Sequence, residues 1–203
     1  MATVQEVLQL GPEDAGRIIT PDDFDAAEGE EGWRYELIRG VLVVSPIPRK
    51  PSRGMAGKLM HLFESYADYR RLSEDQLTVM FEEEIRIPSG SRRRCDVAVW
   101  IALGRKAQAD DAPTITVEFV SKRKADIKRD YVDKRADYWA ASVQEYWIID
   151  RHQRRLTALR RKGRRWEEHV LEEGELYRTP LLPGFRLNLS DLFARADAVA
   201  EED

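Results

Sequence analysis

The sequence predicts an α/β fold in which a sheet lies between helices. Residues 115–150 read as strand, helix, strand, because two apolar runs flank a highly charged segment. Residues 92–100 predict another strand, and this strand and the one at 115–120 are apolar on both faces, which is typical of the middle of an α/β sheet. Apolar positions at helical spacing in residues 53–70 add an amphipathic helix that would cover the sheet.

The remaining elements follow from caps, turns and alternation. Thr20, followed by proline and two acids, predicts the start of a short helix that reaches about Ala27. Residues 34–46 predict a hairpin that carries Glu36 in its first strand, where the simplest interpretation is a solvent-facing acid. Residues 79–87 predict a strand. The C-terminal part adds an arginine-rich hairpin, an extended piece and a short helix.

Composition indicates one domain over residues 1–203, with a core at about 20–193 and acidic termini that fray. The chain has 203 residues, of which 42% are hydrophobic. No apolar run is long enough to span a membrane, and the N-terminus lacks the pattern of a secretory signal. The single cysteine, Cys95, excludes an intramolecular disulfide. These observations together predict a cytoplasmic protein.

The net charge of -4 conceals a basic middle between acidic flanks. Residues 92–165 hold 20 Lys and Arg but 10 Asp and Glu. Such a segment either binds a polyanion or folds so that its charges lie beside the acidic flanks. Arginines at 92–94 abut Asp96, and the basic run 122–129 follows Glu118, so we expect this clustering to favour DNA.

Asp96 and Glu118 are the two acids that interrupt the apolar strands. Alternation places Asp96 on the face of Ala98 and Trp100, and two carboxylates on neighbouring strands would repel each other. A hard divalent cation such as Mg²⁺ takes oxygen ligands and would relieve that repulsion. The helix that follows contains Asp130 and Lys134, which share a face and read as an ordinary ion pair unless Lys134 reaches the two acids.

These residues resemble the PD-(D/E)XK nuclease superfamily and, more closely, a putative restriction endonuclease family of small prokaryotic proteins. The matching segments, in chain order, are YELIRG (35–40), VVSP (43–46), DVAV (96–99), VEFVS (117–121), Asp130, Lys134, EYWIID (145–150) and LPGF (182–185). The sequence departs from the pattern at four places. Ser142 replaces a glycine that is common in the helix-to-strand turn, and the histidine that opens a helix after Ser-Pro is missing, with Ser52 and Arg53 in that region. Cys95 replaces the usual proline before the first acid, and Val120 stands where the lysine of a plain ExK motif would be.

The resemblance implies a restriction-endonuclease-like core, a mixed sheet flanked by helices with added hairpins. It implies that Asp96 and Glu118 hold Mg²⁺, with Mn²⁺ as an alternative ion, and that Glu36 supports the site. It also implies that the lysine has moved to the helix as Lys134, although Lys122 is a second candidate. The expected function is then a metal-dependent DNA endonuclease, with Asp130 assisting and a homodimer left open.

Two other interpretations stay open. The chain could be a catalytically inactive nucleic-acid-binding or protein-interaction module on the same scaffold, because a fold alone does not specify a function. Alternatively, Asp96 and Glu118 could be structural acids that pair with arginines. The distinguishing observation is whether the two carboxylates lie close enough to share one ion.

Overall fold

The structure, a computed structural model, describes residues 7–121 and 128–200. Its centre is a six-stranded mixed sheet in the order β12-β11-β10-β9-β8-β5. Strands β9 and β10 run parallel and the other neighbours are antiparallel. The strands are β5 (Leu77–Phe81), β8 (Val97–Ile101), β9 (Ile115–Phe119), β10 (Glu145–Asp150), β11 (Arg155–Lys162) and β12 (Arg165–Glu172).

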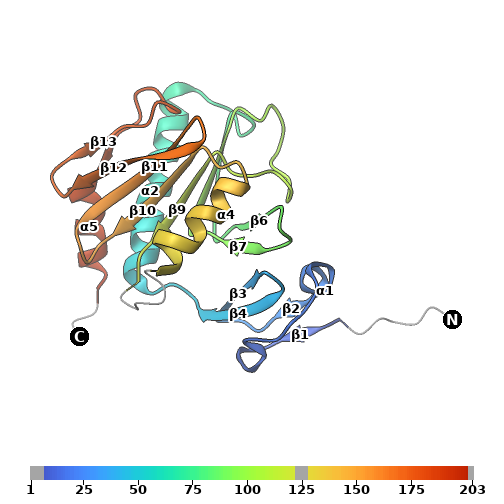
Figure 1. Cartoon of the computed structure of the whole chain (residues 1–203). Helices are drawn as coiled ribbons and strands as arrows, with labels where there is room; N and C mark the ends of the chain where they lie inside the picture. The colour runs from blue at the N-terminus through green and yellow to red at the C-terminus, as the bar shows by residue number, and fades with distance from the viewer. Residues whose placement is uncertain (1–6, 122–127, 201–203) are drawn as a thin grey trace.

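Helices cover both faces of this sheet (Figure 1). On one face, α2 (Lys50–Arg70) and α5 (Leu189–Ala198) bury Leu59, Phe63 and Phe193 against Val97, Val117 and Ile149. On the other face, α4 (Lys134–Ala140) packs Tyr138 against Ala98, Tyr146 and Ile148. The fold class predicted from the sequence, a mixed sheet flanked by helices, is therefore confirmed.

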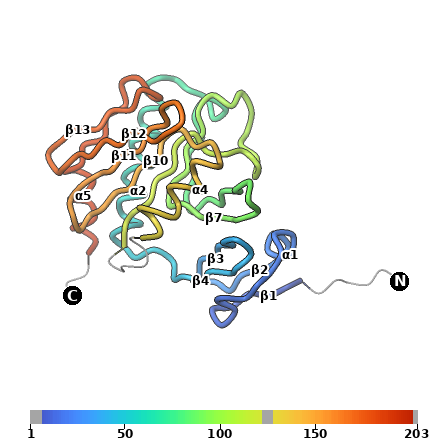
Figure 2. Tube along the Cα trace, viewed as in Figure 1, coloured from blue at the N-terminus to red at the C-terminus, as the bar shows by residue number. Residues whose placement is uncertain are grey.

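A second sheet, in the order β4-β3-β7-β6, lies beside the central one. Its strands are β3 (Trp33–Ile38), β4 (Val41–Pro46), β6 (Glu84–Arg86) and β7 (Arg92–Arg94). Figure 2 shows the hairpin β3–β4 below the central sheet, connected directly to α2. The predicted hairpin is confirmed, and its turn places Arg39 and Gly40 at positive φ.

The N-terminal part packs on this second sheet. Thr20 caps α1 (Pro21–Ala26) by accepting a hydrogen bond from the Asp23 N–H, as predicted. Phe24 packs there with Leu37 and Leu42. The short pieces are β1 (Gln9–Leu10), the 3-10 turn η1 (Pro12–Asp14), β2 (Glu28–Gly29), β13 (Leu176–Tyr177) and β14 (Leu187–Asn188).

Two predictions about strands are wrong. Residues 79–87 and 92–100 do not form one strand each, since both are divided between the two sheets: β5 and β8 lie in the central sheet, and β6 and β7 lie in the second. The chain bends at Glu82, whose φ is 54°. Hydrogen bonds from the Glu82 N–H to the Asp96 carbonyl and from the Cys95 N–H to the Glu83 carbonyl continue the pairing through the bend. Asp96 therefore lies at the junction of the sheets.

Within the described ranges, no helix is both long and apolar enough to cross a membrane.

Candidate active site

The site residues predicted from the sequence are all buried, and they come from four parts of the chain. Exposed fractions range from 5% for Asp96 to 1% for Asp130 and Lys134, with Glu36 at 4% and Glu118 at 2%. Burying five charged groups costs free energy unless they interact with one another or with a bound ion. Their mutual contacts therefore decide what the cluster can do.

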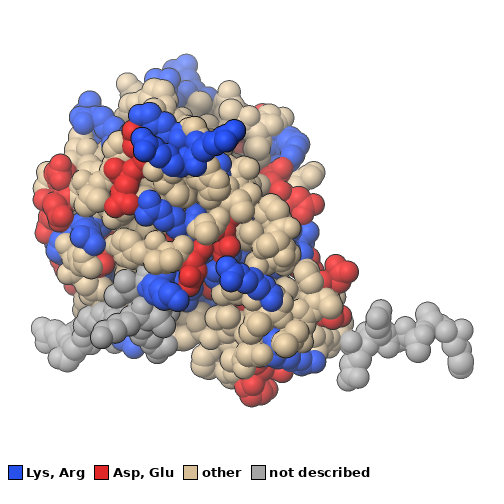
Figure 3. Space-filling model, viewed as in Figure 1, with Lys and Arg blue, Asp and Glu red and all other residues tan. Residues whose placement is uncertain are grey.

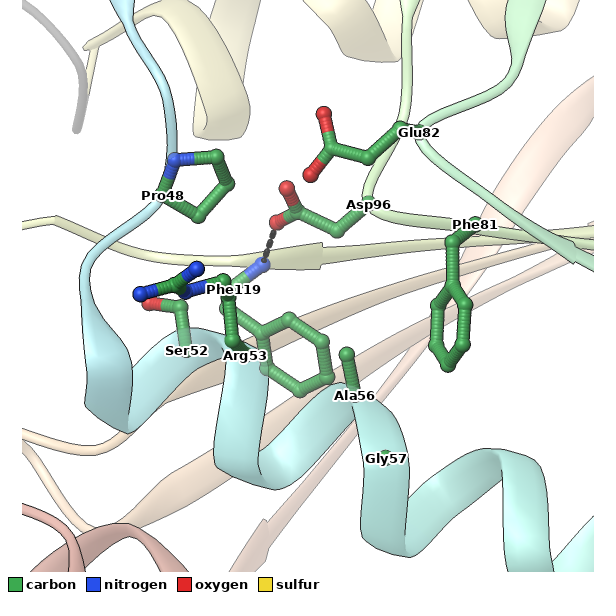
Figure 4. Close-up of a pocket in the computed structure, with 9 residues that line it drawn as sticks. All are labelled: Pro48, Ser52, Arg53, Ala56, Gly57, Phe81, Glu82, Asp96 and Phe119. Carbon is green, nitrogen blue, oxygen red and sulfur yellow. Dashed lines mark hydrogen bonds between the residues drawn. The ribbon is translucent and has the colours of Figure 1, made fainter. Parts of the chain in front are cut away.

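Asp96 is held by the bend between the two sheets. Its Oδ2 accepts a hydrogen bond from the Phe119 N–H at 2.6 Å, and its Oδ1 lies 2.5 Å from the Arg34 guanidinium, which also binds Glu82. Figure 4 shows this carboxylate next to that of Glu82, above α2. Strict alternation predicted the opposite face. It fails at the bend, where Cys95 packs with Ala98 instead.

Glu118 lies in β9, directly after Val117, which pairs with Val97 of β8 and whose carbonyl accepts a hydrogen bond from the Asp96 N–H. Its Oε1 accepts hydrogen bonds from Lys134 Nζ at 2.8 Å and from the Tyr138 hydroxyl at 2.6 Å. Burial raises the pKa of Glu118 to about 8; the Lys134 ammonium opposes this shift, and the negative charge of Asp96 adds to it. The Asp96 carboxylate is thus close enough to disfavour the ionisation of Glu118.

Lys134 begins α4 directly after a π-helical turn, η2 (Arg129–Asp133). Its Nζ donates to Glu118 and, at 2.7 Å, to the carbonyl of Arg94. Burial lowers the pKa of Lys134, but the carboxylates of Glu118 and Glu36 outweigh that effect and raise it above its ordinary value. The ammonium therefore stays charged in a site that water hardly reaches.

Asp130 does not form the expected ion pair with Lys134. Its carboxylate instead lies 3.3 Å from Arg129 Nε, while its backbone carbonyl accepts from the Tyr146 hydroxyl. The π-helical turn changes the offset between positions 130 and 134, and Lys134 turns toward Glu118. Burial raises the pKa of Asp130 to about 6, with Lys134 and Arg129 opposing.

Glu36 is buried, so its interpretation as a solvent-facing strand acid is wrong. Its Oε1 accepts from the Arg94 N–H at 3.1 Å and lies 3.8 Å from Lys134 Nζ. Burial alone would raise the pKa of this carboxyl, but the cations Lys134, Arg129 and Arg93 lower it below its usual value. Glu36 therefore supplies a fixed negative charge behind Lys134.

The arginines at 92–94 contribute less to a phosphate-binding surface than the sequence suggested. Arg92 pairs with Asp25 at 2.8 Å, and the buried Arg93 pairs with Asp137 at 2.6 Å. Figure 3 shows basic and acidic side chains interleaved over the face that it presents. Opposite charges thus meet in the folded chain, as the simpler interpretation of the charge pattern predicted. Lys122 and most of the run 122–129 lie outside the described residues.

Sequence reasoning missed two residues of the cluster, Arg34 and Tyr138. The spacing of each residue from a predicted site residue could have indicated it. Arg34 precedes Glu36 by two positions in β3, so the two side chains share a face of the strand. Tyr138 follows Lys134 by four positions in α4, so these side chains share a face of the helix.

The donor set suits a hard divalent cation. Asp96 and Glu118 supply carboxylate oxygens, and Mg²⁺ is commonly held by one or two carboxylates while it keeps several waters. Burial is the main cause of the raised pKa of Glu118 and the negative charge of Asp96 adds to it, so a bound cation would favour the ionised carboxylate. No group of three or more His, Cys, Asp or Glu side chains able to hold a metal occurs in the described part of the chain, so this pair would need water or substrate as further ligands.

Comparisons with known proteins identify the family and the fold of the chain. The family described as "Uma2: Putative restriction endonuclease" matches residues 21–190. A crystal structure of a putative nuclease belonging to DUF820 from Anabaena variabilis superimposes with a TM-score of 0.69 at 18% identity, covering 88% of this chain and 99% of that one. This likeness shows a shared restriction-endonuclease-like fold.

A second solved structure, a cryo-EM structure of a DrdV–DNA complex, is 15% identical over 68% of this chain and 13% of that one, with a TM-score of 0.33. A similarity this low carries no argument. No curated protein sequence is significantly similar to the chain.

Proposed function

The chain belongs to the Uma2 family of putative restriction endonucleases, and we propose that it is a Mg²⁺-dependent DNA endonuclease. The family supports a nuclease-like function. The metal, the DNA substrate and the individual residue roles are the parts that we add. A cytoplasmic location and a homodimer, which would bring two sites to the two strands of a duplex, belong to the same proposal.

One observation carries the proposal: Lys134 Nζ lies 2.8 Å from Glu118 Oε1, and the Asp96 carboxylate accepts a hydrogen bond from the N–H of Phe119, the residue after Glu118. The residues that the resemblance named, which are far apart in the sequence, thus converge in one buried cluster. A buried pair of this kind does not stabilise a fold better than apolar residues of similar volume would. Strongly shifted pKa values in a cluster of this composition are typical of functional sites.

In this proposal, Asp96 and Glu118 would hold the metal, and the backbone and Tyr138 hydrogen bonds fix their carboxylates. A bound Mg²⁺ polarises the scissile phosphate and lowers the pKa of a bound water. Lys134 donates two of its three hydrogens to protein oxygens, which leaves the third for the attacking water or a phosphate oxygen. Glu36 and Asp130 keep Lys134 protonated by their negative charge.

One specific observation favours the inactive-module alternative. Arg34 already neutralises Asp96 at 2.5 Å and Lys134 neutralises Glu118, which is the arrangement expected of structural acids. Under that interpretation the scaffold binds nucleic acid or a protein without hydrolysis. The two interpretations differ in what a divalent metal does to DNA in the presence of the protein.

The test is cleavage of supercoiled plasmid and linear DNA with Mg²⁺, with Mn²⁺ and with a chelator. We expect metal-dependent nicking that falls by at least about 100-fold in Asp96→Ala, because the metal loses one of its two protein ligands. Asp133→Asn is the control, since Asp133 is an exposed acid of the π-helical turn that directly precedes Lys134. Equal cleavage by the wild type and Asp96→Ala would remove the enzyme interpretation, and metal-independent DNA binding by both would favour the inactive module.

A further inference from the structure

A cavity of about 280 Å³ opens beside Asp96, between α2 and the bend at Glu82 that joins β5 to β6. Figure 4 shows its lining, in which Phe81 and Phe119 stand over the helix and the Asp96 carboxylate lies at one side. Apart from that carboxylate, Glu82 and the Arg53 guanidinium, the wall is largely apolar. The cavity therefore joins an apolar chamber to the proposed metal ligand.

The cavity presents an aromatic side chain at its mouth. Phe81 is 42% exposed, although it belongs to a strand of the central sheet, whereas Phe119 is nearly buried. A large aromatic ring left partly in water at the rim of an apolar cavity is available to stack on a planar ligand. Every nucleobase has such a planar face, and stacking on aromatic rings is the common way in which proteins hold unpaired bases.

The floor of the cavity is kept open by small residues of α2. Gly57 lies in the interior of the 21-residue helix, where glycine is less favourable than alanine by roughly 1 kcal/mol. Packing does not require this glycine, because a Cβ at position 57 would meet nothing within 4 Å and its φ is not positive. With Ala56 beside it, Gly57 leaves space that almost any other side chain would reduce.

We propose that this cavity receives one unstacked nucleobase, belonging to a nucleotide next to the phosphate at Asp96. The proposal rests on the proposed nuclease function and names its substrate class: single-stranded or locally unpaired DNA. A volume of about 280 Å³ is at the low end for ligand pockets, which suits a single heterocycle better than a larger group. A base within a duplex is stacked and paired, and it must be extruded at a cost before it can enter.

Arg53 supplies a positive charge that would match the phosphate of a bound nucleotide. It is an exposed residue of the N-terminal part of α2 and lines the same cavity as Asp96 and Phe81. A nucleotide offers an apolar, planar base and an anionic phosphate, and these correspond to the aromatic wall and to the guanidinium. Arginine contacts to phosphate give affinity without reading the base sequence, so we expect little preference among the four bases.

The test compares binding of a short single-stranded DNA with an oligonucleotide of equal length whose sugars carry no bases. Ca²⁺ replaces Mg²⁺, and fluorescence anisotropy gives Kd. We expect the wild type to bind the strand with bases about tenfold or more tightly. Gly57→Leu fills the cavity and improves helix propensity, so it should lose most of this preference while staying folded. Gly57→Ala is the matched control and should keep it.

Phe81→Ala removes the aromatic wall instead of filling the cavity, and it should also lose the preference. Equal binding of the two oligonucleotides by the wild type, no binding of either, or a full preference in folded Gly57→Leu and Phe81→Ala would each overturn the proposal. Cleavage of DNA with Mg²⁺ is scored separately. Base-dependent binding without cleavage would support base binding in the cavity and contradict the nuclease function. Cleavage without base-dependent binding would support the nuclease function and contradict base binding in the cavity.

Discussion

Glu118 carries its charge in the least favourable surroundings of the cluster. It is 2% exposed, and Asp96 and Asp130 both add negative potential to it. Its compensation comes from two donors, Lys134 and Tyr138, which share the same oxygen. This balance makes the protonation of Glu118 sensitive to small changes in its surroundings.

The first prediction concerns stability without metal. Unfolded Glu118 loses its proton near its ordinary pKa of 4.5, but folded Glu118 loses it near 8. Between these values the folded state binds the extra proton, so the free energy of unfolding falls as pH rises, by up to about 1.4 kcal/mol per pH unit. Asp130 acts in the same direction only up to about pH 6. From about pH 6 to about pH 8, we expect Glu118→Gln to show a flatter urea-unfolding profile than the wild type in chelator.

The control for that measurement is Glu145→Gln, which changes a buried acid at the start of β10, where that strand pairs with Ile115 at the other end of β9 from Glu118. Glu145 accepts hydrogen bonds from Trp147, Tyr177 and Thr179, and it takes no part in the cluster. This variant should lose stability yet keep the pH slope of the wild type. A Glu118→Gln profile with the same slope as the wild type would contradict the raised pKa.

The second prediction is that Tyr138→Phe weakens metal binding. Its hydroxyl donates to Glu118 at 2.6 Å and stabilises the ionised carboxylate. Loss of a hydrogen bond that orients a metal ligand typically costs about tenfold or more in metal affinity, and about 1 kcal/mol in stability. Calorimetric titration with Mn²⁺ measures the effect. Tyr146→Phe is the matched control, because its hydroxyl binds the Asp130 carbonyl and not Glu118; equal affinities in the two variants would argue against a positioning role for Tyr138.

At the scale of the element, the bent hairpin made of β5, β6, β7 and β8 creates the site. Its bend carries Asp96 away from the face that alternation assigned and toward the Phe119 N–H. The sequence did not predict the bend, because residues 79–87 contain no glycine or proline that would mark an interruption of the strand at Glu82. A positive φ at a glutamate is set by the surrounding fold and leaves no local signal.

The acids themselves were predictable for the opposite reason. A carboxylate inside an apolar strand is costly wherever the strand lies, so Asp96 and Glu118 drew attention without any tertiary information. Lys134 needed the family resemblance, since position 134 alone reads as an ordinary helix lysine. Arg34 was missed because its partner Asp96 is 62 positions away, a pairing that only the packing of β3 against the bend creates.

Arg34 connects β3 to the bend through its hydrogen bond to Asp96, and this contact has a consequence for metal binding. The guanidinium and a divalent cation would both neutralise the same carboxylate, so we expect them to compete for Asp96. Arg34→Met should destabilise the metal-free protein by about 3 kcal/mol, because it leaves a buried charge unpaired. Mg²⁺ should then raise the melting temperature of Arg34→Met more than that of the wild type. Arg92→Met, which breaks a pair with Asp25 instead, should respond to Mg²⁺ as the wild type does; an equal response of all three proteins would exclude the competition.

In the molecule as a whole, Glu118 meets α4 on one face of the central sheet, whereas a cluster of aromatic rings packs between α2 and the other face. There Phe185 stacks on Phe63 with ring centroids 4.7 Å apart, and Tyr66 meets it edge-on. Trp147 of β10 packs against Phe63 and Tyr177 in the same core. The LPGF segment that matched the family thus joins the C-terminal chain to α2 and the sheet, and we assign it to stability.

Phe185→Ala tests whether the aromatic core can be weakened without a change in metal affinity at the site. Phe185 is 2% exposed, so its truncation should leave a cavity and cost about 3–5 kcal/mol, measured by urea unfolding. Folded molecules of the variant should keep the Mn²⁺ affinity of the wild type, because the Phe185 ring packs against other aromatic rings, those of Phe63, Tyr66 and Trp147, and not against the acids of the cluster. The reverse pattern is expected for Tyr138→Phe, with a small loss of stability and a large loss of affinity. If Phe185→Ala weakened Mn²⁺ binding as strongly as Tyr138→Phe does, the aromatic core would have to hold α2 and β9 in the positions that the metal needs.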